Sequence, residues 1–207
     1  MISTLKAKRR IVSGLPIAGT SQRIGLLGGS FNPAHQGHVQ ISEIAKARLG
    51  LDQIWWLVSP RNPLKTTSDL ADLEVRVAQA SSIAHPGIVR VTSLEASICA
   101  RYSIETVRFL REHYRAVQFV WIVGADNLAI FHRWKCWREI AATMPLAAID
   151  RPGAGFAAAA SRFAAVFARN RMDEADAGAL ATASPPAWTM IHGPLSPLSS
   201  TAIRREI

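Results

Sequence analysis

The feature that most constrains this chain is the stretch G-G-S-F-N-P-A-H-Q-G-H at residues 28–38. An apolar run, Ile24 to Leu27, precedes it, and a helical pattern follows it. A strand, a glycine turn and a helix start, in that order, are how α/β proteins direct backbone N–H groups at a phosphate. Gly28 and Gly29 carry no side chain that would collide with a ligand. The stretch therefore predicts a phosphate-binding turn at the end of a first strand.

The two histidines of this stretch, His35 and His38, are expected at the turn and at the start of the helix, where both can face one bound group. As zinc ligands they lack a third ligand at a recognisable spacing. As part of a serine triad they lack a nucleophile elbow. A surface turn with two incidental histidines is the remaining structural alternative. Stabilising the transition state of a phosphoryl group requires only that both rings point at one phosphate, and the pattern favours this role.

Apolar runs and helical periodicity alternate along the rest of the chain. Strands are predicted at residues 23–30, 53–59, 88–94, 117–123, 146–149 and 188–191. Helices are predicted from residue 38 to 49, from an N-cap at Ser68 to residue 84, from residue 102 onward and over residues 157–168. This alternation predicts an α/β fold with a doubly wound, Rossmann-like parallel sheet.

Further candidate residues follow the predicted strands, because ligands of open parallel sheets gather beyond the carboxyl ends of strands. Lys65 lies in a polar loop after the second strand, where a substrate contact and a solvated lysine are equal alternatives. Asp126, in the G-A-D segment after the fourth strand, is placed to accept hydrogen bonds from ribose hydroxyls or to cap a helix. The run L-S-S-T-A-I-R at residues 198–204 offers hydroxyls, a helix start and a guanidinium, so it is a second phosphate-binding device.

Two common nucleotide-binding motifs are missing from the sequence. There is no G-x-x-x-x-G-K-[ST], which argues against a P-loop kinase or ATPase, and no G-x-G-x-x-G, which argues against dinucleotide-dependent redox chemistry.

The formal net charge of +9 comes partly from the N-terminus. Residues 1–23 carry five basic and no acidic residues, so the remaining body has 19 basic and 15 acidic residues. We therefore expect a basic, flexible extension over residues 1–22 and a single domain over residues 23–207. The extension lacks the aromatic residues that nucleic-acid-binding segments interleave with basic ones, which argues against a nucleic-acid-binding protein.

Localisation follows from the cysteines and from the apolar patterning. Two distant cysteines, Cys99 and Cys136, fit a reducing compartment. No apolar window is long enough to span a membrane, and the N-terminus lacks the apolar core of a secretory signal. We expect a cytoplasmic protein without a membrane partner, and the sequence leaves a homo-oligomer open.

The motif G-G-S-F-N-P-x-H-x-G-H resembles the signature of the H-x-G-H nucleotidyltransferases, most closely that of the bacterial nicotinate-nucleotide adenylyltransferases. The G-A-D segment and the C-terminal S-S-T-A-I-R resemble the same family, so the resemblance covers roughly residues 23–207. It implies that the 5′-phosphate of nicotinate mononucleotide attacks the α-phosphate of ATP, which releases pyrophosphate and forms nicotinate adenine dinucleotide. It also implies Mg²⁺ held mainly by phosphates and water, without a protein metal cage.

The resemblance implies a role for each matching residue. The catalytic residues are His35, His38 and Arg204. The ATP-binding residues are Gly28, Gly29, Ser30, Phe31, Gly124, Asp126, Ser200 and Thr201. For the second substrate the resemblance implies Ser103, Thr106 and Trp134, with the ring of Trp134 stacked on the pyridine. Lys65 is added to this set from its position after the second strand.

This chain departs from the family pattern at three places. Ser103 stands where relatives often carry Thr, Lys135 stands where they often carry an aromatic residue, and the chain ends at Ile207 where a longer closing helix is expected.

Two alternatives to this function stay open at the level of the sequence. One is a sister nucleotidyltransferase that uses nicotinamide mononucleotide, phosphopantetheine or a cytidylyl acceptor. Phosphopantetheine relatives usually carry T-x-G-H, so His35 counts against that acceptor. The other is a nucleotide-binding regulator without catalysis, against which the intact His35, His38 and Arg204 argue. The sequence does not decide between nicotinate and nicotinamide.

Overall fold

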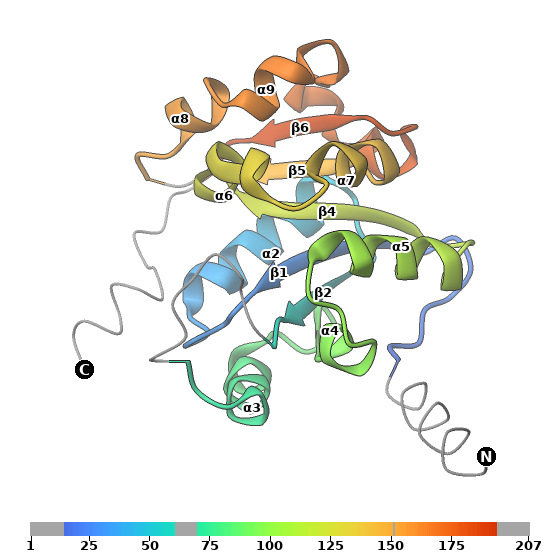
Figure 1. Ribbon diagram of the computed structural model, residues 1–207, viewed down its shortest axis with the longest axis vertical. Helices are drawn as coiled ribbons and strands as arrows, with labels where there is room; N and C mark the ends of the chain where they lie inside the picture. The colour runs from blue at the N-terminus through green and yellow to red at the C-terminus, as the bar shows by residue number, and fades with distance from the viewer. Residues whose placement is uncertain (1–14, 61–69, 151, 194–207) are drawn as a thin grey trace.

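Six parallel strands form the centre of the protein in its computed structural model, which describes residues 15–60, 70–150 and 152–193 (Figure 1). The strands are β1 Arg23–Gly29, β2 Gln53–Val58, β3 Val89–Thr92, β4 Gln118–Gly124, β5 Leu146–Ile149 and β6 Trp188–Ile191. Their order in the sheet is β3-β2-β1-β4-β5-β6, and every neighbouring pair is parallel. The predicted doubly wound parallel sheet is confirmed.

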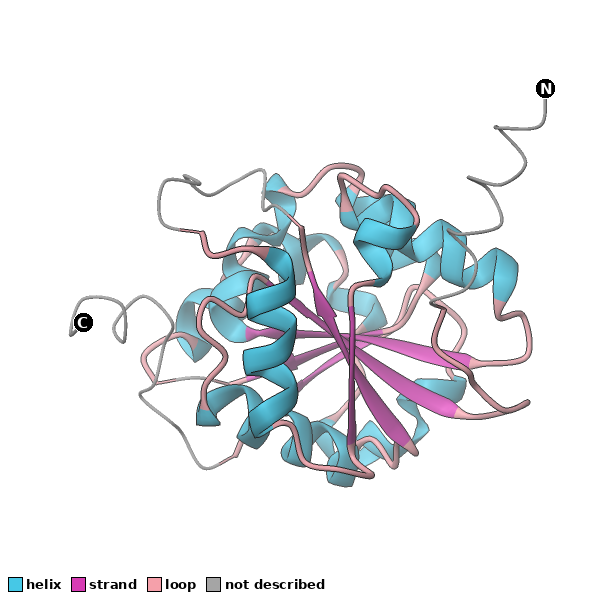
Figure 2. Ribbon diagram, turned by 90° about the horizontal axis from the view of Figure 1, so that it is seen from below, coloured by secondary structure: helices cyan, strands magenta, loops and turns pink. Residues whose placement is uncertain are grey.

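The central strands read as nearly continuous apolar runs because helices cover both faces of the sheet. Alternate residues of β4 point to opposite faces: Phe119 and Trp121 pack into one buried cluster, whereas Val120 and Ile122 pack into the other. Figure 2 shows the twisted strands between the two helical layers.

The first helical layer packs on the face that contains Val120 and Ile122. It consists of α2 Gln36–Arg48, α3 Leu73–Ile83 and the 3₁₀ segment η3 Glu174–Thr182. The opposite layer consists of α4 Leu94–Ser97, α5 Ser103–His113, α6 Ala125–Ile130, η1 Phe131–Arg133, α7 Trp137–Thr143, α8 Gly155–Ala159, α9 Arg162–Val166 and η2 Ala168–Asn170. In Figure 1, α5 and α7 lie in front of the strands and α2 lies behind them. No helix in the described ranges is long and apolar enough to cross a membrane.

The strand order reverses between β1 and β4, which are neighbours in the sheet. The chain leaves β1 toward β2 on one side and leaves β4 toward β5 on the other. Such a reversal opens a crevice beyond the carboxyl ends of the two strands. The glycine turn after β1 and the G-A-D segment after β4 both lie at this edge, on adjacent strands.

Two predicted helices differ from the structure. Helix α3 begins at Leu73 with Asp72 as N-cap, so the predicted N-cap at Ser68, which lies outside the described residues, is wrong. The predicted helix over 157–168 is two short helices, α8 and α9. The break falls at Ser161, whose hydroxyl accepts a hydrogen bond from the Ala164 N–H at 3.1 Å and starts a new helix.

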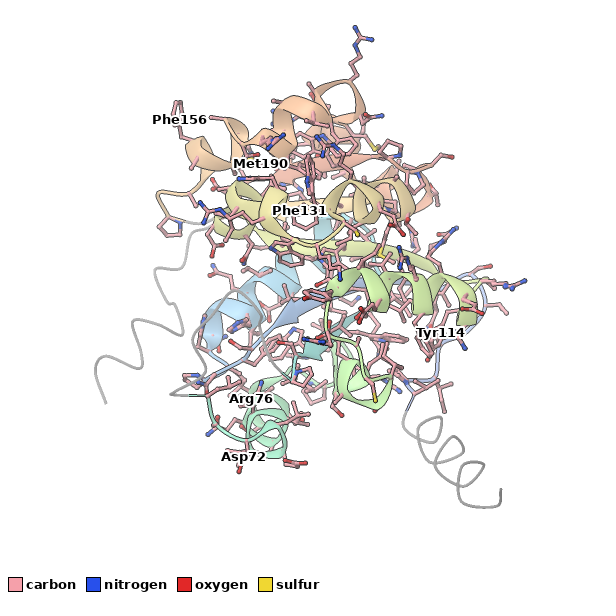
Figure 3. All side chains as sticks on the ribbon, in the orientation of Figure 1. Asp72, Arg76, Tyr114, Phe131, Phe156 and Met190 are labelled. Carbon is pink, nitrogen blue, oxygen red and sulfur yellow. The ribbon has the colours of Figure 1, made fainter. Side chains whose placement is uncertain are left out.

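Part of the predicted N-terminal extension lies against the folded body. Leu15 and Ala18 pack against the buried cluster beneath α5. Tyr114, labelled in Figure 3, donates its hydroxyl hydrogen to the Pro16 carbonyl at 2.8 Å, and the Ser21 N–H donates to the Ala116 carbonyl at 2.7 Å. Within the described residues, the packed structure therefore begins before residue 23.

Candidate active site

The turn after β1 is open above Gly28 and anchored below by Phe31. Among the described residues, a Cβ atom on Gly28 would meet nothing closer than the ring of Trp121 at 3.6 Å, so a ligand has room to approach the backbone there. Phe31 adopts a left-handed φ of 47° and buries its ring, which stacks on Trp56 with the ring centroids 5.0 Å apart. The chain bends sharply at Phe31 because this ring is held in the core.

His35 and His38 form the start of α2 together. His35 is the N-cap, and its Nδ1 accepts the Gly37 N–H at 3.1 Å. The Nδ1 of His38 accepts the His35 N–H at 3.2 Å, which completes a capping box made of two imidazoles. Because each Nδ1 is an acceptor, the hydrogen of each neutral ring resides on Nε2. The ring centroids are 4.0 Å apart, so the structure brings the two predicted residues together with fixed orientations and tautomers.

The same helix turn is tied to the sheet through Ser42. Its hydroxyl donates to the His38 carbonyl at 2.8 Å and accepts the indole N–H of Trp56, on β2, at 2.7 Å. A buried side chain of β2 therefore sets the height of His38 above the sheet.

Arg76 is a site residue that the sequence analysis missed. It lies on α3 (Figure 3) and is 1% exposed. Its guanidinium donates to the carbonyls of Ser30 and Ser59 at 2.7 and 2.8 Å. Burial lowers the pKa of Arg76 from its usual range, and the nearby Asp72 partly opposes that shift. A signal was available in the sequence: Arg76 shares the buried stripe of α3 with Ala80, four residues on, where a charge is unexpected.

At the end of β4, Gly124 rather than Asp126 is the N-cap of α6. Asp126 lies exposed in the first turn of that helix, where a carboxylate suits the helix dipole. Both predicted residues therefore lie at the carboxyl edge of the sheet, on the strand next to β1.

Ser103 and Thr106 share the first turn of α5 but have different surroundings. Ser103 is half-buried, whereas Thr106 is fully buried and its hydroxyl donates to the carboxylate of Glu95 at 3.2 Å. Burial raises the pKa of Glu95 to about 7, and the hydrogen bond from Thr106 partly opposes that shift. Glu95, which the sequence analysis also missed, thus connects α4 to the start of α5.

Trp134 lies in an aromatic group that reaches the glycine turn. Its ring is 4.8 Å from that of Phe131 and 6.4 Å, edge-on, from that of Trp121, which in turn faces Gly28. The indole N–H of Trp121 is buried without a hydrogen-bond partner among the residues that the structure describes. The Lys135 ammonium lies 4.3 Å from the ring centre of Tyr102, the N-cap of α5. Lys135, which follows Trp134 in the chain, therefore reaches the start of α5.

Several predicted residues lie outside the described ranges. They are Lys65, Ser200, Thr201 and Arg204. Within the described ranges, no group of three or more His, Cys, Asp or Glu side chains is arranged to hold a metal ion.

Comparison with known proteins gives the family. The model of the cytidylyltransferase-like family matches residues 26–206. The probable nicotinate-nucleotide adenylyltransferase of Brucella suis is 51% identical over 182 residues, which is 88% of this chain and 94% of the relative. That of Rhizobium meliloti is 51% identical over 181 residues, 87% of this chain and 96% of the relative, and that of Methylorubrum extorquens is 53% identical over 182 residues, 88% and 98%.

Solved structures support the fold. The nicotinic acid mononucleotide adenylyltransferase of Plasmodium falciparum, complexed with NaAD, aligns over 89% of this chain and 83% of its own, with a TM-score of 0.63 and 16% identity. Together with the two-histidine turn at the sheet reversal, the near full-length similarity to the bacterial relatives leads to one conclusion. This chain belongs to the cytidylyltransferase-like family and, within it, to the nicotinate-nucleotide adenylyltransferases.

Proposed function

We propose that this protein transfers the adenylyl group of ATP to nicotinate mononucleotide, giving nicotinate adenine dinucleotide and pyrophosphate. The observation that carries the proposal is the pair of imidazoles at the start of α2, held 4.0 Å apart at the reversal point of the sheet. The names of relatives more than 50% identical over most of the chain support the choice of substrates.

The reaction needs no protein nucleophile. An oxygen of the 5′-phosphate of nicotinate mononucleotide bonds to the α-phosphorus of ATP, and the bond from that phosphorus to the pyrophosphate oxygen breaks. Negative charge grows on the α-phosphate oxygens as this happens. The Nε2–H groups of His35 and His38 are the donors that stabilise this charge, since both Nδ1 atoms are used by the helix start.

We assign the ATP site to both ends of the chain. The backbone of Gly28, Gly29 and Ser30 approaches the phosphates, and Phe31 shapes the turn from the core. Gly124 and Asp126 receive the ribose. Ser200, Thr201, and Arg204 bind the β- and γ-phosphates.

For nicotinate mononucleotide, we assign Ser103 and Lys65 to polar contacts and Trp134 to the pyridine ring. Because the Thr106 hydroxyl is bonded to Glu95, we give Thr106 the task of holding the first turn of α5 in place.

Mg²⁺ neutralises part of the triphosphate charge in this proposal. A hard cation prefers oxygen ligands, and the described residues provide no cluster of protein ligands for it, so phosphate oxygens and water would hold it. We also place the enzyme in the cytoplasm, a proposal that the two free, exposed cysteines, Cys99 and Cys136, support.

The test is pyrophosphate release from ATP and Mg²⁺ with nicotinate mononucleotide, nicotinamide mononucleotide or phosphopantetheine in parallel. We expect a strong preference for nicotinate mononucleotide. The variant His38→Ala should lose about a hundredfold or more in kcat, the usual effect of removing a donor to a developing charge. His85→Ala, which changes an exposed histidine after α3, is the matched control and should keep its activity.

Two other outcomes would overturn parts of the proposal. Selective turnover of another acceptor would keep the chemistry and replace the substrate. No turnover with any acceptor, with ATP still bound, would favour a nucleotide-binding regulator.

A further inference from the structure

The guanidinium of Arg76 joins three chain segments that meet at the carboxyl edge of the sheet. From α3 it donates through Nη1 to the Ser30 carbonyl at 2.7 Å, in the turn after β1. It donates to the carbonyls of Ser59 and Pro60, after β2, at 2.8 and 3.3 Å. Its Nε donates to the Ala71 carbonyl, just before α3, at 2.7 Å.

These contacts belong to a wider set of bonds around the glycine turn. The N–H and the hydroxyl of Ser59 donate to the Gly29 carbonyl at 2.9 and 3.3 Å. The side-chain oxygen of Asn32 accepts the Ala71 N–H at 3.3 Å. The carbonyls of Gly29 and Ser30, two consecutive residues of the turn, therefore both accept hydrogen bonds from residues outside the turn. Arg76 is the donor that connects the turn to α3.

The chemistry of the group explains why an arginine occupies this position. A buried charge is costly unless it is compensated, so an apolar side chain would suit a mere packing position on α3 better. The planar guanidinium has five N–H donors in a fixed fork, and four of its hydrogen bonds end on backbone carbonyls of three segments. A lysine ammonium, a point charge on a flexible stem, cannot keep such a set of directions.

We propose that Arg76 is a positioning residue for adenylyl transfer, which fixes the G-G-S-F-N turn in the geometry that receives the triphosphate of ATP. This inference rests on the proposed function, because it takes the turn to be the ATP site. Arg76 acts through the backbone of Ser30 and needs no contact with substrate.

The experiment compares Arg76→Lys with the wild-type enzyme and with Thr189→Val. Thr189 is fully buried on β6, where its hydroxyl donates to the Met172 carbonyl at 3.1 Å, so its variant removes a buried polar contact away from the turn. Steady-state kinetics are measured per folded molecule, with the folded fraction taken from circular dichroism at the assay temperature.

We expect Arg76→Lys to lower kcat by about tenfold to a hundredfold, as small displacements of reacting groups do, and to raise KM for ATP. KM for the acceptor should stay near the wild-type value, and Thr189→Val should keep the wild-type kcat and both KM values. If the role of Arg76 were purely structural, Arg76→Lys would lower the folded fraction, but kcat and KM for ATP per folded molecule would not change relative to KM for the acceptor.

A second variant keeps the test decisive if Arg76→Lys does not fold. Asn32→Ala removes the neighbouring hydrogen bond between the turn and the Ala71 N–H. It should lower kcat and raise the KM for ATP, as Arg76→Lys does, but to a smaller extent. Wild-type constants per folded molecule in the folded variants would overturn the proposal for Arg76. Absence of turnover in the wild-type enzyme with any acceptor would instead overturn the proposed function.

Discussion

At the scale of single residues, His35 connects secondary structure with chemistry. One nitrogen of its ring caps α2, and the cap decides which nitrogen carries the hydrogen. Because Nδ1 accepts the hydrogen bond of the cap, the ring would present its Nε2–H donor to the α-phosphate. Capping and transition-state stabilisation use different atoms of one side chain, so substitutions can separate them.

The comparison of His35→Asn with His35→Ala makes that separation. Asn is a good N-cap, so His35→Asn should keep the unfolding free energy close to the wild-type value, whereas His35→Ala should lose about 1 kcal/mol. Both variants lack Nε2–H, and both should lose most of their pyrophosphate release. Urea unfolding and the pyrophosphate assay measure the two effects independently. High turnover in His35→Asn would show that the ring is needed only as a cap.

At the scale of elements, the buried carboxyl of Glu95 connects the short helix α4 to the first turn of α5. The two helices are joined by a loop in which Cys99 adopts a left-handed φ of 56°, so the hydrogen bond between Glu95 and Thr106 crosses a tight corner. The ring of Tyr102, the N-cap of α5, also contacts the Lys135 ammonium, and Lys135 follows Trp134 in the chain. A change in the protonation of Glu95 therefore acts on an element that we assign to the second substrate.

The raised pKa of Glu95 predicts how stability depends on pH. The carboxyl has a pKa of about 7 in the folded protein and 4.5 as the reference value. Between these values the unfolded chain loses the proton while the folded protein keeps it. The free energy of unfolding should therefore fall as pH rises through this window, by at most about 1.4 kcal/mol per pH unit.

Glu95→Gln removes this titration, so the free energy of unfolding of the variant should depend less on pH between about pH 4.5 and pH 7 than that of the wild-type protein. The measurement is the urea midpoint at a series of pH values, with Glu112→Gln, an exposed glutamate of α5, as the matched control. Parallel curves for the wild-type protein and Glu95→Gln would contradict the assignment.

At the scale of the whole molecule, β1 contributes both to the packing of the sheet and to the candidate active site. Two of its glycines have different surroundings for this reason. A Cβ atom on Gly25 would come within 2.5 to 2.8 Å of the side chains of Ile122, Ile54 and Leu51. Within the part of the chain that the structure describes, a Cβ atom on Gly28 would meet only the ring of Trp121, at an ordinary 3.6 Å. Gly25 thus fits the close packing of Ile122, Ile54 and Leu51 on one face of β1, whereas no other described residue fills the space above Gly28, which is open to a ligand.

Alanine substitution should therefore affect stability at Gly25 and ATP binding at Gly28. Gly25→Ala overpacks the core and should lower the unfolding free energy by about 1–3 kcal/mol. Gly28→Ala should leave stability nearly unchanged and should weaken ATP binding, measured by calorimetry, because its methyl group would occupy the ligand's space. Equal ATP affinity in Gly28→Ala and the wild-type protein would place the triphosphate elsewhere.

Local patterns were sufficient for most of the sheet. The predicted strands 146–149 and 188–191 coincide with β5 and β6, because short apolar runs bounded by polar or proline residues have few alternatives. The helix over 157–168 was wrong because a run of alanines concealed the competing cap at Ser161. Alanine favours a helix at every position, so composition alone does not mark such a break.

The amino-acid sequence was enough to establish the α/β class, the parallel strands and the turn with two histidines, because each follows from periodicity or from residues close together in the chain. It did not reveal that Arg76 reaches Ser30, 46 positions away, or that Glu95 meets Thr106 across a corner. Nor did it place Trp121 between Gly28 and Trp134.

Those contacts exist only once the strands take the order β3-β2-β1-β4-β5-β6, which brings distant loops to one edge of the sheet. A side chain buried by tertiary packing must find its hydrogen-bond partners among whatever segments the fold places around it, and local sequence patterns do not specify those segments.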